Sequence, residues 1–460
     1  MEFGDIRLDN RGKRLVESIC DCQRVCIRQF SEGRNEEVSN GRFLRNQKVT
    51  PEKMLPYAYN KAAGLCAGKH VLLVEDTSTM NFGLAPTAGY MAPVGSGAEA
   101  GRGFYVHPVI ALDAGQGNCL GLAHATFFER KEHPPDSPMQ DADERKRQRN
   151  RTALEEKESH RWLDAALRAG QVCGQAAQLT VVADQEADIY EVLARLDRAG
   201  VGFLVRTGYD RSLRDGDFDN LRPYLESLPV GHSFELALPA TDKRSPHTAA
   251  LDVKCGATRL KRTDIGDYKG LPQSLAVTVV EVLERPQTVV GNEKPICWRL
   301  LTSIQPQSVE DILQIIRWYC WRWVIEQLFR TIKRQGLDIA SAEVETVHGL
   351  KNLTAAALMA AVRVMQLVQA RQGGSELRDT EVFDEREADL LEKLSPKLEG
   401  RTPGQKNPHP GHSLAFAAWV IARLGGWKGY SSSERPPGPI TMSRGLRRFQ
   451  DMVMVVGLSP

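Results

Sequence analysis

The sequence of 460 residues carries little net charge: 60 Lys and Arg stand against 58 Asp and Glu, which leaves a formal charge of +2. Any nucleic-acid surface must therefore come from local clusters of Arg and Lys, because the chain as a whole is not basic. Internal repeats and low-complexity tracts are also missing, which excludes repeat and fibrous architectures. No apolar run approaches the ~20 residues that span a bilayer, so we expect no membrane segment.

Cysteine is sparse and odd in number. The nine thiols are mostly scattered, and no secretory n-region or apolar h-region precedes them, which predicts a reducing cytoplasm and no disulfide framework. Cys20, Cys22 and Cys26 do cluster, but this spacing lacks the second ligand pair of a zinc site and lies within a helical pattern. A zinc site and plain half-buried thiols both stay open, and the spacing favours the thiols.

The composition itself is that of an ordinary globular protein, with 42% hydrophobic and 26% charged residues. At about 150 residues per domain, the length predicts roughly two to four domains. The N-terminal part reads as helical: a helix over Asp9–Phe30, a polar stretch to Asn40, a short helix over Gly41–Asn46, and a new helix starting at Thr50-Pro51. This favours a small helical DNA-binding module, and a helical bundle with a solvated basic face is the alternative.

Two strands in the next part of the chain end in acidic residues. The apolar run Val71–Val74 leads into Glu75-Asp76, and the run Leu179–Ala183 leads into Asp184, with a helix predicted over Glu186–Ala199. Between these strands the pattern predicts further elements, namely strands over Gly103–Leu112 and Gly121–Phe128, a charged connection over Asp136–Arg151 and a helix over Ala153–Ala169. The fold class is therefore α/β with a mixed sheet, and the strand-end acids suggest a site.

Alternating patterns such as Ser233–Leu238 and Ala276–Val280 predict a β-rich insertion between Val201 and Leu301. A long helix then begins at Ser308, the N-cap candidate, with Asp311 three positions on, and runs to Gln335, where Gly336 stops it. The stretch Gly373–Gly411 reads as a linker with one short helix, followed by an apolar helix over Leu414–Leu424.

The long helix carries Tyr319, Arg322, Glu326 and Lys333 within roughly a 60° arc of its surface. The apolar residues on its other faces argue against a purely solvated charged stripe, which remains the alternative. Two acids at strand ends and one on a helix suit a two-metal phosphoryl-transfer site, where carboxylates hold divalent ions about 4 Å apart. Acids at strand ends also occur in unrelated α/β enzymes, so spacing alone leaves this open.

Several motifs resemble the DDE transposases of the IS-four type, and most closely the Tn-five (insertion-sequence fifty) group among them. The resemblance rests on Glu75-Asp76-Thr77-Ser78, on Ala183–Ile189 and on Y-x2-R-x3-E-x6-K, met by Tyr319, Arg322, Glu326 and Lys333. Weaker matches spread over nearly the whole chain: Gly41–Asn46, Glu156–Ser159, Val205-Arg206, Trp298 with Leu300–Ser303, and Ala422–Gly426. One departure is Gln185, where the family commonly has Arg, and the N-terminal and C-terminal parts match only in patches.

The resemblance implies an RNase H-like catalytic domain over 57–372 with the β-rich insertion at about 207–304. An N-terminal helical DNA-binding domain over 1–56 precedes it, and a linker with a C-terminal helical dimerisation region over 373–460 follows. It makes Asp76, Asp184 and Glu326 the catalytic acids, holding Mg²⁺ or Mn²⁺, with two ions per site, and Asp188 a structural neighbour. The implied protein is a bacterial, cytoplasmic, nucleoid-associated homodimer that acts on double-stranded transposon ends and target DNA.

The same resemblance, together with the distribution of basic residues, nominates DNA-binding groups. Trp298 would stack on a flipped base, and the other expected contacts are Tyr319, Arg322, Arg330, Lys333, Arg206, Arg42, Arg45, Lys243, Arg244, Lys261 and Arg262. The helix over Leu414–Leu424 would pair two subunits through Trp419, Ile421 and Leu424, and packing inside one chain is the alternative. Two other functions stay open: a catalytically silent DNA-binding inhibitor and a different RNase H-like nuclease.

Overall fold

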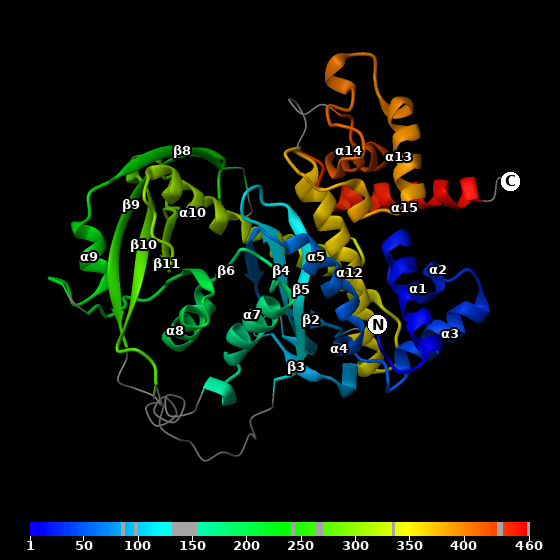
Figure 1. Ribbon diagram of the computed structural model, residues 1–460, viewed down its shortest axis with the longest axis horizontal. Helices are drawn as coiled ribbons and strands as arrows, with labels where there is room; N and C mark the ends of the chain where they lie inside the picture. Colours follow the sequence, from blue (N-terminus) through cyan, green and yellow to red (C-terminus); the bar gives the residue numbers. More distant parts are fainter. Residues whose placement is uncertain are drawn as a thin grey trace.

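The computed structural model describes residues 1–83, 88–95, 100–130, 154–214, 216–238, 240, 244–262, 270–333, 336–429 and 436–457. Within these residues, eleven strands form one sheet that runs through the left half of Figure 1, and helices from both ends of the chain gather at the right. The mixed α/β class predicted from the sequence is confirmed.

Five strands form the centre of the sheet in the order β5-β4-β1-β6-β7. Their bounds are β1 His70–Glu75, β4 Gly101–Asp113, β5 Cys119–Phe128, β6 Gln178–Ala183 and β7 Gly202–Arg206. The first three make an antiparallel meander, and β6 and β7 run parallel to β1. This order fits an RNase H-like core. Because β1 and β6 are parallel neighbours, Asp76 and Asp184 leave the sheet at the same edge.

Short strands β2 Ser78–Asn81 and β3 Ala92–Val94 pair with the first half of β4, just beyond the end of β1 that leads into Asp76. The insertion is rich in β-structure, as predicted, and comprises α9 Leu221–Ser227, β8 His232–Leu238, β9 His247–Lys261, β10 Ser274–Glu284 and β11 Cys297–Thr302. Its last strand, β11, pairs antiparallel with β7, so that Leu300 faces Arg206. The insertion therefore continues the core sheet and carries Trp298 towards the strand ends.

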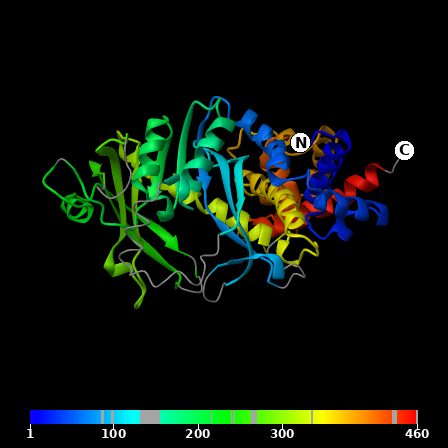
Figure 2. The ribbon, with the colours of Figure 1, turned by 90° about the horizontal axis from the view of Figure 1, so that it is seen from below.

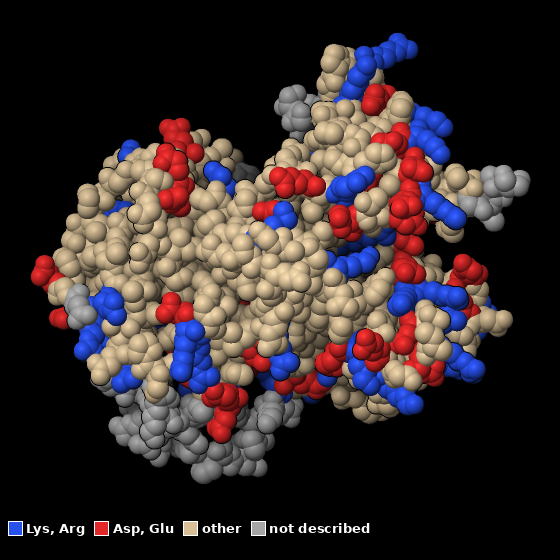
Figure 3. All heavy atoms as spheres, in the orientation of Figure 1, with Lys and Arg blue, Asp and Glu red and all other residues tan. Residues whose placement is uncertain are grey.

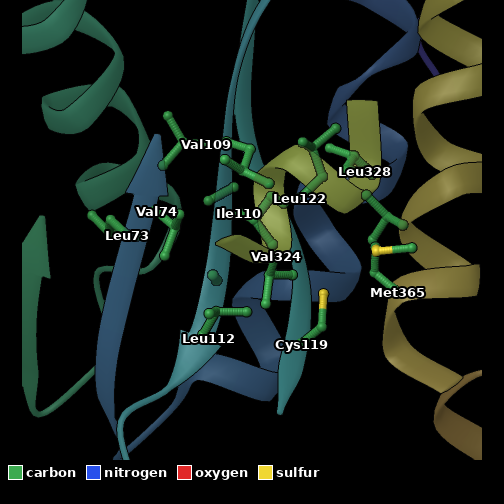
Figure 4. Close-up of a cluster of buried hydrophobic side chains, with 14 of the residues drawn as sticks. Leu73, Val74, Val109, Ile110, Leu112, Cys119, Leu122, Val324, Leu328 and Met365 are labelled. Atoms are coloured by element: carbon green, nitrogen blue, oxygen red, sulfur yellow. The ribbon is translucent and has the colours of Figure 1, made fainter. Parts of the chain in front are cut away.

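Helices cover both faces of the core strands (Figure 2). On one face lie α7 His160–Val172, α8 Tyr190–Arg198 and, beside α7 against β5, α5 Pro56–Cys66. On the other lie α10 Val309–Trp321, α11 Trp323–Lys333 and α12 Val347–Ala370. Figure 4 shows apolar side chains of β1, β4 and β5 facing Val324 and Leu328 of α11 and Met365 of α12, all buried. This core fixes α11 against the central strands.

Two predicted helices start later than expected. The helix over Glu186–Ala199 begins at Tyr190, because Asp184 caps a 3-10 turn over Gln185–Ala187 through its side chain. The helix predicted from Ala153 begins at His160, after a separate 3-10 turn over Leu154–Glu156. Further 3-10 turns lie at Ala88–Tyr90, Pro286–Thr288, Ile339–Ser341, Asp379–Glu381 and Pro403–Gln405.

The long helix predicted from Ser308 is two helices. Its start is confirmed, since Ser308 and Asp311 form a reciprocal capping box. At Arg322 the ladder tightens: the Arg322 N–H bonds to the Tyr319 carbonyl, and the Ile325 N–H bonds to the Arg322 carbonyl. These three-residue spacings end α10 and begin α11 at Arg322, the one arginine of the predicted stripe.

The N-terminal helices also differ from their predicted bounds. The first helix, α1 Ile6–Cys22, ends where Gln23 adopts a φ of 50°, and only α2 Ile27–Phe30 follows before the next turn. The polar stretch expected after it is mostly helix, α3 Arg34–Arg45, because Asn40, Phe43 and Leu44 bury one face of it. The predicted start at Thr50-Pro51 is confirmed by α4 Pro51–Met54.

The N-terminal helices pack on α12 and share one continuous core with the sheet. The buried amide of Asn352 donates to the carbonyl oxygens of Leu44 and Val49, each at 2.9 Å. By length and composition α12 could cross a membrane, contrary to the expectation that no run is long enough. However, 83% of its most apolar window is buried inside the protein, as in a central core helix.

The C-terminal part is more helical than a linker. It holds α13 Glu385–Leu398, α14 Leu414–Leu424 and α15 Pro439–Gly457. The predicted bounds of α14 are confirmed, but the pairing surface expected on it is not available: Trp419, Ile421 and Leu424 are all buried. They lie within the chain's own core, where α14 contacts α12, α13 and α15, since an unbroken apolar helix finds cover on every side.

Candidate active site

Two carboxylates follow neighbouring parallel strands and are oriented by the backbone just after them. The N–H of Thr77 donates to Asp76 Oδ1 at 2.7 Å, and the N–H of Glu186 donates to Asp184 Oδ1 at 2.8 Å. Each aspartate thus ends a buried strand and uses one oxygen to cap the following turn, which leaves its second oxygen for other partners.

Arg322 connects the strand-end acids to the helical acid. At the break between α10 and α11 its guanidinium donates to Asp76 Oδ2 at 3.4 Å and to Glu326 Oε1 at 2.9 Å. The Arg322 side chain is 8% exposed, and its Nε has no hydrogen-bond partner among the described residues. Asp76 and Glu326, which are 250 positions apart, therefore meet at a single buried cation.

The acids crowd one another electrostatically. Burial, followed by the negative charge of Asp184, raises the pKa of Asp76 to about 7. Burial by itself lowers the pKa of Arg322, but its surroundings, including the negative charges of Asp76 and Glu326, outweigh burial and raise this pKa. Asp184 thus lies close enough to act on both Asp76 and Arg322, and the cluster has more negative charge than its arginine balances.

Oxygen donors in a cluster short of positive charge fit a divalent ion of the Mg²⁺ or Mn²⁺ type. Asp76 and Glu326, which contact Arg322, and Asp184, whose charge acts on Asp76, supply the carboxylate oxygens of this cluster. Among the described residues no three acidic, His or Cys side chains are arranged to coordinate an ion as they stand, because Arg322 lies between two of the acids.

Three of the predicted DNA-contacting residues lie around the same arginine. The rings of Trp298 on β11 and Tyr319 on α10 have centroids 6.1 Å apart, and the Arg322 guanidinium lies 5.8 Å from the Tyr319 ring. Arg206 donates to the Cys297 carbonyl at 3.4 Å, beside Trp298, and its charge acts on the Tyr319 hydroxyl, although burial raises the pKa of that hydroxyl overall. Trp298 is partly buried, and Tyr319 is buried.

The other basic candidates are dispersed. Arg330 is exposed and Lys333 half-buried, both further along α11 than Glu326. On α3, Arg42 is exposed, whereas Arg45 pairs with Glu345 at 2.7 Å. In the insertion, Arg244 is half-buried and near Glu293, and Lys261 is exposed at the end of β9. Arg262 donates to the Leu271 carbonyl, and Lys243 lies outside the described residues.

Charge on the helical part is mixed. On the face shown in Figure 3, acidic and basic side chains alternate over the helices at the right, and no broad area of one sign covers them. Arg11 pairs with Glu36 at 3.1 Å and Arg34 with Glu37 at 2.8 Å, which reduces the basic character of α1 and α3. The N-terminal helices therefore offer single exposed arginines such as Arg42, in keeping with the small net charge.

Asp188 is held as an internal brace. Its side chain is fully buried, accepts from the Thr207 hydroxyl at 2.6 Å and forms an ion pair with Arg211 at 2.6 Å. Both its oxygens are thus engaged by Thr207 and Arg211, and its structural role stays a prediction.

The sequence did not indicate one set of residues that contacts the two turns carrying Asp76 and Asp184. Arg161 on α7 donates to the Thr77 hydroxyl at 2.9 Å and pairs with Glu186 at 2.9 Å. Thr77 and Glu186 stand in the motifs that carry the resemblance, and Arg161 follows Glu156–Ser159, but no spacing in the sequence indicates that they meet.

The family model for the transposase DDE domain matches residues 125–363, which is more than half of the chain. The chain belongs to the transposase DDE domain family. The match contains Asp184, Glu326 and the β-rich insertion, and it begins after Asp76. The predicted DDE transposase family is therefore confirmed for this DDE domain protein.

Among solved structures, the chain is similar to a piggyBac transposase in a synaptic complex with hairpin DNA, seen by cryo-electron microscopy. The identity is 11%, and the similarity covers 74% of this chain and 59% of that chain, with a TM-score of 0.28. The chain thus spans about three fifths of that transposase's length. A TM-score this low carries no argument about the architecture or activity of the DDE domain protein.

Proposed function

We propose that this chain is a cut-and-paste DNA transposase of the IS-four type, similar to the Tn-five group, which binds the terminal inverted repeats of its element, excises the element and inserts it into target DNA. The observation that carries the proposal is the meeting of Asp76 and Glu326 at Arg322, with Asp184 on the adjacent strand end. Clustered carboxylates are the ligands that a two-metal phosphoryl-transfer site uses.

When bound, a pair of divalent ions would activate the attacking oxygen and stabilise the leaving oxygen. The chain's own groups then have separate tasks. Asp76, Asp184 and Glu326 hold the positive charge at the strand ends, and Arg322 faces the phosphate once a cation neutralises the acids. Trp298, Tyr319 and Arg206 form the adjoining wall, where a base extruded from a strained hairpin could stack on the indole.

Two subunits acting on two ends, as in a synaptic complex, belong to the proposal, as do the N-terminal DNA-binding domain over 1–56 and a C-terminal dimerisation region over 373–460. The support for an N-terminal DNA contact is the exposed Arg42 on α3. The support for C-terminal pairing is the exposed apolar end of α15 at Met454 and Val456.

The test is cleavage of DNA that carries the inverted repeats flanking the gene, in Mg²⁺. Wild-type protein is expected to nick and then release both ends, and D76A, D184A and E326A are each expected to lose strand cleavage while keeping end binding, because metal ligation and DNA grip reside on different groups. Cleavage at the wild-type rate by any one of the three variants would contradict the proposed catalytic triad. Metal-independent end binding without cleavage by wild type would instead support the silent-inhibitor alternative.

A further inference from the structure

Arg161 lies behind the active site and contacts the residue next to one catalytic aspartate and the residue two positions after the other. Its Nε donates to the Thr77 hydroxyl at 2.9 Å, one terminal nitrogen donates to Glu186 at 2.9 Å, and the other donates to the Glu158 carbonyl at 3.0 Å. The guanidinium fork is thus fully used inside the protein, and the side chain is only 11% exposed.

These contacts reach the catalytic acids through the backbone. Thr77 donates its N–H to Asp76, and Glu186 donates its N–H to Asp184. The turn that carries Asp76 and the turn that carries Asp184 are therefore both hydrogen-bonded to the same planar guanidinium, and its rigid fork sets the distance between the two turns.

The connection continues into the core below Thr77. Arginine can only donate, so the Thr77 oxygen accepts from Arg161 and its single proton points to His107 Nδ1, 2.8 Å away. The other ring nitrogen of His107, Nε2, then carries the proton and donates to Glu75 at 3.3 Å. His107 and Glu75 are fully buried, so this chain of hydrogen bonds anchors Thr77 to β1 and β4.

The ion pairs of Arg161 contribute little to stability. Glu186 is 61% exposed and Glu158 is 40% exposed, and exposed pairs of this kind contribute about 0–1 kcal/mol. An arginine that makes weak pairs at this place acts on the geometry of its neighbours more than on the free energy of unfolding.

Building on the proposed function, we infer that Arg161 is a positioning residue that joins the two acid-bearing turns through Thr77 and Glu186 and so preorganises Asp76 and Asp184 for their divalent ions. Groups in this outer position change metal affinity by about 10- to 100-fold when they are removed. Arg161 does not itself contact DNA in this assignment.

The experiment measures Mn²⁺ binding by calorimetry and, separately, end-DNA binding in metal-free buffer. R161M is expected to weaken Mn²⁺ binding by about 10- to 100-fold and to leave metal-free DNA affinity within about twofold of wild type. The Mn²⁺ affinity of R161K is expected to lie between those of wild type and R161M, because one ammonium cannot span Thr77 and Glu186. The control is R168M, on the same helix, whose partner Asp164 lies away from the strand ends and whose side chain is 59% exposed; it should bind Mn²⁺ like wild type.

A second pair of variants covers the case in which R161M does not fold. T77V removes the hydroxyl but keeps the shape, and should weaken Mn²⁺ binding as R161M does, whereas T77S should restore it. Unchanged Mn²⁺ affinity in R161M or T77V overturns the inference, and so does a loss of metal-free DNA binding in R161M, which would make Arg161 a DNA contact. If wild type neither binds Mn²⁺ nor cuts DNA, the proposed function is wrong. If wild type does both and R161M binds Mn²⁺ like wild type, the proposed function stands and only the role of Arg161 is wrong.

Discussion

Ionised Asp76 lowers the unfolding free energy of the metal-free protein, because burial and the nearby Asp184 oppose its ionisation. Its pKa is raised from 3.8 to about 7, so between these values the folded carboxyl keeps a proton that the unfolded one has lost. Stability is therefore unaffected by this group below about pH 4 and falls as the pH rises to about 7.

The variant D76N should remove this cost. In EDTA at about pH 8 we expect D76N to be more stable than wild type by roughly 1–3 kcal/mol, since one pKa unit corresponds to about 1.4 kcal/mol and local relaxation reduces the effect. At about pH 4 the two proteins should unfold alike. Urea unfolding at both pH values checks this, and an equal gap at both would show that the carboxyl is not the cause.

Asp188 should behave in the opposite way, as a residue of the fold. D188A leaves Arg211 and the Thr207 hydroxyl without their buried partner, and we expect a loss of roughly 2–4 kcal/mol in unfolding free energy. Single-turnover cleavage below the unfolding temperature should fall by less than about tenfold, a far milder effect than the loss expected for D184A. If D188A stays fully stable and loses cleavage, Asp188 belongs to the chemistry.

At the scale of elements, β11 and the break between α10 and α11 bring an indole, a phenol and a guanidinium together beside the acids. Trp298 faces Val282 across the β10–β11 ladder and has Tyr319 within 6.1 Å. The partly buried indole lies at the edge of the core, so it is placed both to pack and to stack.

We expect W298A to nick each transposon end and then to accumulate nicked DNA, with hairpin formation slowed by about tenfold or more. The reason is that stacking on an extruded base contributes about 1–3 kcal/mol. W298F keeps a ring and should recover most of the second step. Gel analysis of the two steps decides the matter: equal slowing of both, or unfolding seen by circular dichroism, assigns Trp298 to the core.

At the scale of the whole molecule, the N-terminal and C-terminal helices meet on α12 and α15, and the right half of Figure 1 shows them stacked beside the sheet. Because α14 is covered within the chain, pairing of subunits falls to surfaces that remain exposed. The end of α15 offers Met454 at 60% and Val456 at 55% exposure.

The double variant M454E/V456E should therefore prevent assembly of two subunits on two DNA ends while single-end binding persists, because each charge opposes burial of the exposed end of α15. The matched control is I440E, at the other end of α15, where Ile440 is 47% exposed. Sedimentation of the DNA complexes measures this. If the M454E/V456E protein still forms a complex of two subunits on two DNA ends, the subunits pair through another surface.

Features that depend on neighbouring residues could be predicted from the sequence alone. Apolar runs followed by Asp76 and Asp184 predicted strand ends, Ser308 with Asp311 predicted a helix start, and the bounds of α14 were predicted correctly, because burial and capping impose local periods and local hydrogen bonds. The Y-x2-R-x3-E-x6-K spacing likewise indicated that Arg322 and Glu326 share a face, and the structure places them in contact.

Which distant groups meet depends on how the elements pack. Nothing in the spacing shows that Arg322 contacts Asp76, that Arg161 joins Thr77 to Glu186, or that the apolar face of α14 is covered by its own chain. A helical period records that a face is buried and leaves the partner unspecified, since any complementary apolar surface satisfies it. The partner, and with it the geometry of the acids, follows from how the sheet and helices pack together.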